Sequence, residues 1–238
     1  MKYTYQNYKK INKNELFLTY PRLFTLLNSY YPLGIRAMNP DYNEYIGFKK
    51  LQKLILTSLK NSNSNKPKWA NEFLEKVKKI TNCEVIDTTY GNSPNYSGEI
   101  IIETSENCRY TTKMIFFVSF INNYYSIQII KTDKLVNFES EFSPNKTGIG
   151  ILEIVVSPTE KRNKKLFINL DNLIRSEFKD AIFLPFKFDL IKLEEFETPL
   201  NITIDFSSPI SSGFFNKGNI LNEKTNIIGD VNYKLEII

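Results

Sequence analysis

The chain of 238 residues contains no histidine. A protein without an imidazole group has no Ser-His-Asp or Cys-His nucleophile system, no histidine-ligated zinc and no imidazole proton shuttle. The sequence also lacks a glycine-rich phosphate-binding motif. These absences remove the commonest kinds of catalytic site, and they favour a role that is not enzymatic.

Cysteine is scarce: only Cys83 and Cys108 are present. They are too far apart in the sequence to form a CxxC motif. Both flank segments that we expect to be strands, so a disulfide between them and two free thiols are both open. Their small number favours two free thiols in a reducing compartment. Neither residue has a neighbouring base that would make it a nucleophile.

Long apolar runs are also missing, and the first residues of the chain are polar. A membrane-spanning helix needs about 18 or more consecutive apolar residues, so we expect no membrane span. A signal peptide needs an apolar core, which the opening does not supply. We therefore expect a cytoplasmic protein.

The charge balance is mild. Lysine and arginine number 31 against 26 aspartate and glutamate residues, which gives a net charge of +5. This charge permits an anionic partner but does not require one. Apolar residues make up 42% of the chain and aromatic residues 14%, which is typical of a globular protein with well-packed sheets.

The hydrophobic period changes near residue 83, from a helical period before it to a period of two after it. The sequence therefore predicts a mainly helical region over residues 1–82. A mainly β region follows over residues 83–238, with one short helix near 169–179. We leave open whether the two regions form one compact domain.

Three helices are predicted in the first region. The first begins near Asn14 or at Pro21, and the second begins after residues 39–41. A polar loop at residues 61–65 precedes the third helix, which residues 65–67 open. Its buried stripe is predicted to consist of Trp69, Phe73, Val77 and Ile80.

A series of strands is predicted in the second region. The expected strands cover residues 84–89, 97–104, 110–121, 124–131, 150–157, 183–193, 200–206 and 231–238. Asn122 and Asn123 are expected to form a tight turn, because asparagine tolerates a positive φ. The apolar run Met114–Val118 predicts a central strand buried on both faces. On its partner strand, Ser126 and Gln128 are expected to face away from the apolar residues 125, 127 and 129.

These patterns predict an α+β fold in which an N-terminal helical region packs on one or two mainly antiparallel β-sheets.

Carboxylates are the only acid–base groups present in quantity. Glu99 and Glu103 would lie on the same side of a strand about 13 Å apart, which is far for a catalytic pair. The acidic run of Glu194, Glu195 and Glu197 is interpreted as a solvated turn. The triplet from Glu177 to Lys179 has the form of a nuclease ExK motif, but it ends a predicted helix, where lysine favours the helix dipole.

The strongest charge feature is the segment 160–165, which we interpret as a solvated hairpin tip. It contains the candidate anion-binding residues Lys161, Arg162, Lys164 and Lys165. No aromatic residue lies between them, so a base-stacking surface is not indicated. We assign no catalytic residue, cofactor or metal ligand, and we expect no nucleic-acid partner.

The opening of the chain is rich in tyrosine, a residue favoured at protein interfaces and also in helix-on-sheet packing. Within it, the run from Arg22 to Leu27, followed by Pro32 and Arg36, resembles the opening of type VI secretion baseplate wedge subunits. The tail from Leu221 to Ile237 is similar to their final Leu-Gly repeats. The matching positions cover about a fifth of the chain, and the resemblance implies a non-enzymatic subunit that works by protein contact.

The favoured function is protein–protein interaction, as a structural subunit of a bacterial assembly, such as a secretion-system baseplate component, or as an immunity-type inhibitor. Two alternatives remain. A phosphate- or nucleic-acid-binding module would use the basic segment 161–165, extended by Lys76, Lys78 and Lys79. A histidine-independent enzyme would need carboxylates that meet only in three dimensions, with or without a metal ion.

Overall fold

A computed structural model describes residues 2–3, 9–59, 66–140, 143–158, 161–217 and 225–237. For residues 2–3, 134–140, 143–149, 161–162 and 237 it describes the backbone alone. The predicted polar loop at 61–65 and the predicted end of the chain at 238 lie outside the described residues.

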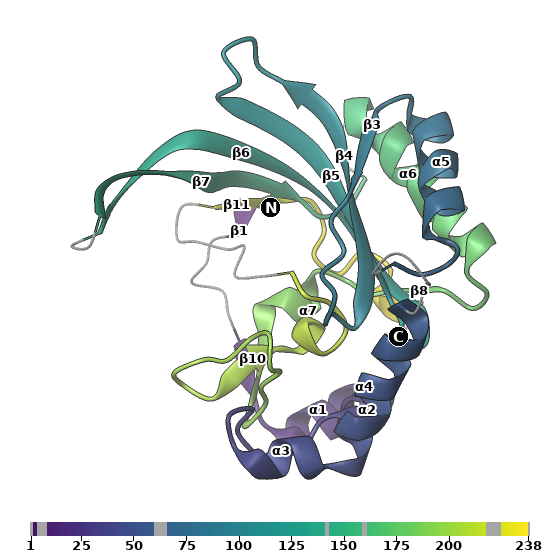
Figure 1. Ribbon diagram of the computed structural model, residues 1–238, viewed down its shortest axis with the longest axis vertical. Coiled ribbons are helices and arrows are strands. Elements are labelled where there is room, and N and C mark those ends of the chain that lie inside the picture. Colours follow the sequence, from purple (N-terminus) through teal and green to yellow (C-terminus); the bar gives the residue numbers. More distant parts are fainter. Residues whose placement is uncertain are drawn as a thin grey trace.

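The fold is α+β, as the sequence predicts (Figure 1). The α-helices are α1 (Lys13–Thr19), α2 (Pro21–Tyr30), α3 (Pro40–Glu44), α4 (Ile46–Leu59), α5 (Ala70–Thr81), α6 (Lys161–Glu177) and α7 (Lys187–Leu190). The 3-10 helices within the described residues are η2 (Ile210–Gly213) and η3 (Leu235–Ile237).

The main sheet has eight strands and is mainly antiparallel. Its strands are β1 (Lys2–Tyr3), β3 (Glu84–Asp87), β4 (Asn95–Thr104), β5 (Tyr110–Ser119), β6 (Tyr124–Ser140), β7 (Ser143–Val155), β8 (Ile182–Phe183) and β11 (Asn226–Ile228). Their order is β1-β11-β7-β6-β5-β4-β3, and β8 pairs with β6. A three-stranded sheet consists of β10 (Ser207–Pro209), β9 (Ile191–Glu194) and β2 (Lys9–Ile11), in that order.

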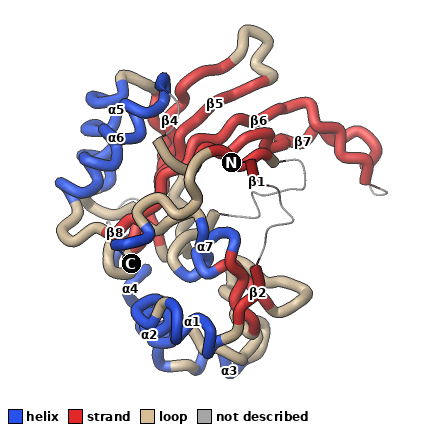
Figure 2. The backbone as a smooth tube through the Cα atoms, turned by 180° about the vertical axis from the view of Figure 1, so that it is seen from behind, coloured by secondary structure: helices blue, strands red, loops and turns tan. Residues whose placement is uncertain are grey.

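Each face of the main sheet carries its own apolar core. Helices α5 and α6 cover one face, while α1–α4, α7 and the three-stranded sheet lie on the other side (Figures 1 and 2). On the helix-covered face, Phe73 of α5 and Phe167 of α6 pack with Phe116 of β5. On the other face, Phe117 of β5 belongs to the core that includes α2 and α4.

The predicted central strand is confirmed. Met114, Phe116 and Val118 of β5 are buried on the α5–α6 side, while Ile115 and Phe117 are buried on the opposite side. A strand that is apolar at every position can pack against one layer on each of its two faces. The partner strand β6 is longer than predicted and continues with β7 as a two-stranded arm (Figure 1).

The turn between β5 and β6 is also confirmed. Asn122 and Asn123 have φ values of 50° and 51°, and the backbone N–H of Tyr124 donates to the carbonyl of Ile121 at 3.3 Å. Two successive residues with positive φ match the twist of an antiparallel hairpin, and asparagine is among the few residues that adopt this conformation at low cost.

The two alternative starts predicted for the first helix, near Asn14 and at Pro21, are the starts of two separate helices, α1 and α2. The predicted second helix is likewise divided into α3 and α4. Asn12 caps α1 by accepting a hydrogen bond from the N–H of Glu15, and Pro21 stands at the first position of α2. In α5, Phe73 and Val77 are buried as predicted. Ile80 is only partly buried, because Ala70 and Leu74 complete the inner face, and Trp69 precedes the helix.

Helix α6 begins at Lys161, whereas the sequence predicts a short helix near 169–179 and a hairpin tip at 160–165. The lysine-rich start has no apolar period of its own, and Phe167 is the first residue of this helix in the core. The hydrophobic pattern therefore marks only the part of the helix that packs on the sheet.

Predicted strands are wrong in three places: in part of 183–193 and throughout the described residues of 200–206 and 231–238. Residues 187–190 of the segment 183–193 form α7. The segment 200–206 is a loop, in which the N–H of Thr203 donates to Glu197. Residues 231–234 form turns, in which Lys234 has a φ of 62° and pairs with Asp171 at 2.6 Å. Side chains that bind nearby backbone groups compete with a strand in this way.

We predict that replacing Asn122 and Asn123 together with valine lowers the free energy of unfolding by about 1–3 kcal/mol, because β-branched residues resist a positive φ. Urea unfolding measures the change. The matched control replaces both residues with glycine, which adopts positive φ readily and should stay close to the wild type. Equal midpoints for the valine and glycine variants would contradict the assignment of the turn.

We also predict that Phe73→Ala lowers the free energy of unfolding by about 3–5 kcal/mol. The Phe73 side chain is buried, and its ring lies 5.7 Å from the Phe116 ring and 5.3 Å from the Phe178 ring. Trp69, with its ring centroid 5.9 Å from that of Phe73, reports on the same contact by fluorescence. Unchanged stability and unchanged Trp69 emission would show that α5 does not dock through this residue.

Candidate functional site

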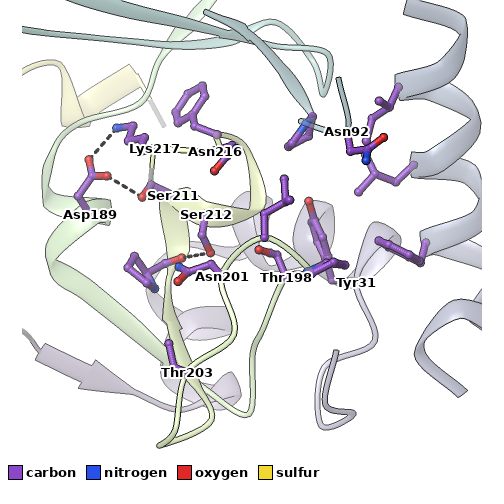
Figure 3. A pocket seen from close by; sticks show the side chains of 18 of the residues that line it. Tyr31, Asn92, Asp189, Thr198, Asn201, Thr203, Ser211, Ser212, Asn216 and Lys217 are labelled. Carbon is purple, nitrogen blue, oxygen red and sulfur yellow. Dashed lines mark hydrogen bonds and ion pairs between the residues drawn. The ribbon is translucent and has the colours of Figure 1, made fainter. Parts of the chain in front are cut away.

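A cavity of about 710 Å³ lies on the side of the main sheet opposite α5 and α6. Its lining comes from β6, β7, α4 and the segment 198–217, which are far apart in the sequence (Figure 3). Ligand-binding cavities in proteins usually have volumes of about 300–1,000 Å³. The cavity is therefore large enough for an organic ligand of ordinary size.

Apolar side chains form most of the inner wall. Phe48, Leu51 and Ile55 recur at three- and four-residue steps along α4, so one helix face turns towards the cavity. Phe186 and Phe215 add aromatic surface from the C-terminal part of the chain, and both are buried. Such walls favour a ligand with an apolar body.

A buried ion pair lies in the lining of the same cavity. The ammonium group of Lys217 lies 2.9 Å from the carboxylate of Asp189, and their side chains are only 8% and 11% exposed. The hydroxyl of Ser211 donates to the other carboxylate oxygen at 2.7 Å (Figure 3), and Lys217 donates to the hydroxyl of Ser126 at 3.1 Å. This network joins β6, α7 and η2.

The environment of Lys217 lowers its pKa. Burial disfavours the charged form and is the larger effect, while Asp189 opposes it by charge attraction and a hydrogen bond. The ammonium also lies 4.9 Å from the centre of the Phe215 ring and 5.5 Å from that of Phe117, which adds cation–π attraction. The ammonium group of Lys217 therefore already contacts a carboxylate, a hydroxyl and two aromatic rings of the protein.

Gln128 is a buried amide of the cavity wall that lies outside this network. It is 2% exposed, it lines the cavity, and its Nε2 atom has no hydrogen-bond partner in the described protein. The sequence places Gln128 two residues from Ser126 on the same face of β6, as the alternation predicts.

Glu197 connects the loop of residues 198–206, which lines the cavity and is called the mouth loop below, to the segment between α2 and α3. Its carboxylate accepts hydrogen bonds from the backbone N–H groups of Ala37 at 3.1 Å and Thr203 at 3.3 Å, and it lies 3.5 Å from the guanidinium of Arg36. Glu197 is only 1% exposed. The prediction of a solvated acidic turn is therefore wrong at Glu197, although Glu194 and Glu195 are exposed.

A close backbone approach fixes η2 against α2. A Cβ atom at Gly213 would lie 2.3 Å from the Cδ2 atom of Leu27, so any larger residue would force the Leu27 side chain to shift. The hydroxyl of Tyr31 donates to the carbonyl of Gly213 at 2.8 Å, and burial raises the pKa of Tyr31 well above its usual value. These contacts set the position of Ser211 and Ser212 in the cavity wall (Figure 3).

The predicted anion-binding residues do not line this cavity. Lys161, Arg162, Lys164 and Lys165 all belong to the first turns of α6, and Lys164 and Lys165 are exposed. The proposed extension of this basic group meets acidic partners. Lys76 pairs with Glu72 and Glu177, and Lys78 pairs with Glu75. Anion binding by the segment 161–165 stays a prediction.

The other candidate carboxylates have structural partners. Glu99 pairs with Lys113 at 2.6 Å, and Glu177 ends α6 beside Lys76 at 2.7 Å. In the described ranges no group of three or more Cys, Asp and Glu side chains is arranged to hold a metal ion. Asp189 is the one carboxylate among the described residues that line the cavity.

The two cysteines are free. Cys83 is partly buried and donates its thiol hydrogen to the carbonyl of Thr81, and Cys108 is exposed in the turn between β4 and β5.

Within the part of the chain that the structure describes, no helix is long and apolar enough to cross a membrane.

Comparisons with protein-family models, with curated proteins and with solved structures found no match to the chain. The site is thus interpreted from its own geometry. Sequence reasoning missed the cavity because its residues come from segments that pair only after folding. The available signal was the pair Ser126 and Gln128, two polar residues within an apolar strand.

We predict that removing one member of the buried ion pair is costly and that removing both is not. Asp189→Leu should lower the free energy of unfolding by about 3–5 kcal/mol, because it leaves the Lys217 charge buried and unpaired. The double variant Asp189→Leu/Lys217→Met should recover most of that loss. Urea unfolding of the wild type, Asp189→Leu, Lys217→Met and the double variant measures this cycle. If the losses of the two single variants simply add in the double variant, the two residues do not interact directly.

Proposed function

We propose that this protein binds a small organic molecule in the cavity of about 710 Å³. The observation that carries the proposal is a pocket with buried aromatic and aliphatic walls and a few convergent polar groups. This combination is the usual composition of a ligand site, in which apolar surface supplies affinity and polar groups fix orientation.

The walls of the cavity are held rigidly enough to support binding. Gly213 and Tyr31 fix η2, the Asp189–Lys217 pair fixes the end of the segment 198–217, and Glu197 fixes the mouth. A preformed site loses less conformational entropy when a ligand binds, so more of the contact energy appears as affinity.

The experiment is a titration with Nile red, a neutral dye that fluoresces strongly in apolar surroundings. We expect one dye molecule to bind per chain, with a blue-shifted emission. Ile55→Trp should weaken binding about tenfold or more, because Ile55 lines the cavity and the larger ring fills it. Lys53→Trp is the matched control, since Lys53 is exposed on the same helix and does not line the cavity.

Dye binding that is equal in the wild type and in Ile55→Trp would refute the proposal, because the dye would then lie elsewhere. Loss of binding in both tryptophan variants would assign the effect to α4 stability, and circular dichroism melting distinguishes that case.

Protein–protein interaction is the second candidate function, and the distribution of exposed apolar side chains favours it. Most of the large exposed apolar residues belong to the N-terminal helical part and to the mouth loop. They are Phe17, Leu18, Met38, Ile46, Leu56, Leu200, Ile202 and Ile204. Exposed apolar residues that gather in one part of a chain are typical of an interaction surface.

The two-stranded arm of β6 and β7 supports the same candidate. Beyond Asp133 on β6, the described pairing continues only with β7, up to the pair Ser140 and Ser143. Within the described residues, neither edge of this arm pairs with a further strand, and such edges can pair with another chain. A structural subunit or an inhibitor would use such surfaces.

A further inference from the structure

We infer that the cavity selects an uncharged ring-bearing ligand, and that the side-chain amide of Gln128 donates a hydrogen bond to its carbonyl or hydroxyl oxygen. This inference rests on the proposed ligand-binding function and names the ligand class. Four features of the cavity carry it: one unpartnered donor, its apolar neighbours, the neutral ion pair beside it and the aromatic walls.

The first feature is the unpartnered donor. Gln128 is 2% exposed and lines the cavity, yet its Nε2 atom has no hydrogen-bond partner in the described protein. Leaving a buried amide donor unpaired costs more free energy than an ordinary hydrogen bond contributes. A ligand oxygen that accepts from this group would recover that cost.

The second feature is the absence of a suitable neighbour on the sheet. Gln128 lies directly opposite Ile115 on β5, and Ile154 of β7 lines the same cavity. Both are buried apolar side chains that cannot accept a hydrogen bond. The nearest polar side chain on its own strand face, Ser126, already accepts from Lys217.

The third feature is the paired state of the buried charge of Lys217. The charge of Lys217 is offset by Asp189 at 2.9 Å, so this pair offers no net positive charge to an anion. Lys192 also lines the cavity, but it is only partly buried and interacts with other groups of the protein. A buried anion would lose its hydration without gaining a counter-charge, so an uncharged ligand is favoured.

The fourth feature is the shape of the apolar surroundings. Phe48, Phe186 and Phe215 line the cavity from three different segments. Aromatic side chains contact the flat faces and edges of other rings favourably. The ligand class is therefore an uncharged ring system with a carbonyl or hydroxyl group at the end that reaches Gln128.

The test uses three probes that share the naphthalene ring and displace Nile red from the protein: naphthamide, naphthoate and naphthalene. Naphthamide is neutral and has a carbonyl oxygen, naphthoate is an anion, and naphthalene has no polar group. We expect naphthamide to bind about tenfold more tightly than either of the others, which is the effect of roughly one hydrogen bond to a buried donor.

The variant Gln128→Leu should bind naphthamide and naphthalene about equally, once displacement is corrected for the variant's own affinity for Nile red, a ring ketone that can accept from the same amide. Gln128→Met is a second variant with a similar volume, in case leucine packs poorly. The matched control is Gln52→Leu, which removes an exposed amide at the mouth on α4 and should keep the preference for naphthamide.

The outcomes separate this inference from the proposed function. If Nile red binds but naphthalene equals naphthamide in the wild type, the ligand class is wrong while the cavity still binds ligands. If naphthoate binds best, the requirement for an uncharged ligand is wrong. If Nile red itself does not bind, the proposed function fails, and the inference fails with it. A clear loss of thermal stability in both Gln128 variants would also overturn the inference, because the amide would then have a partner in the free protein.

Discussion

The double burial of β5 is the constraint on which the rest of the structure depends. Met114 and Phe116 on one face and Ile115 and Phe117 on the other are all buried, so neither face can be left in water. One layer comes from α5 and α6, which directly precede and follow the meander β3 to β7 in the chain. The other layer is assembled from both ends of the chain, and this difference in origin explains where the cavity forms.

A layer built from distant segments covers the sheet incompletely. Helix α4 approaches the sheet from one direction and residues 198–217 approach from another, and the space between them is the cavity. Over this space β6 carries Ser126 and Gln128, whereas its opposite face is apolar at residues 125, 127 and 129. The polar groups are thus concentrated where the second layer leaves the sheet uncovered.

Much of the fold could be predicted from the sequence because local rules decide it. A positive φ at Asn122 and Asn123, Pro21 at a helix start and the apolar run of β5 each depend on nearby residues. The ion pair of Asp189 with Lys217 and the buried carboxylate of Glu197 depend on partners far along the chain. A charged residue in a polar stretch is usually solvated, so nothing local distinguished these two sites.

The buried carboxylate of Glu197 has a consequence for how quickly the cavity can exchange its contents. One carboxylate joins the backbone of Ala37, before α3, to the backbone of Thr203 in the mouth loop, and Tyr42 of α3 donates to the Glu197 carbonyl at 2.7 Å. The loop therefore cannot swing away alone without breaking the hydrogen bond from Thr203 to this buried carboxylate. The mouth and α3 would open together as one cooperative unit, so residence time and equilibrium affinity would be governed by different residues.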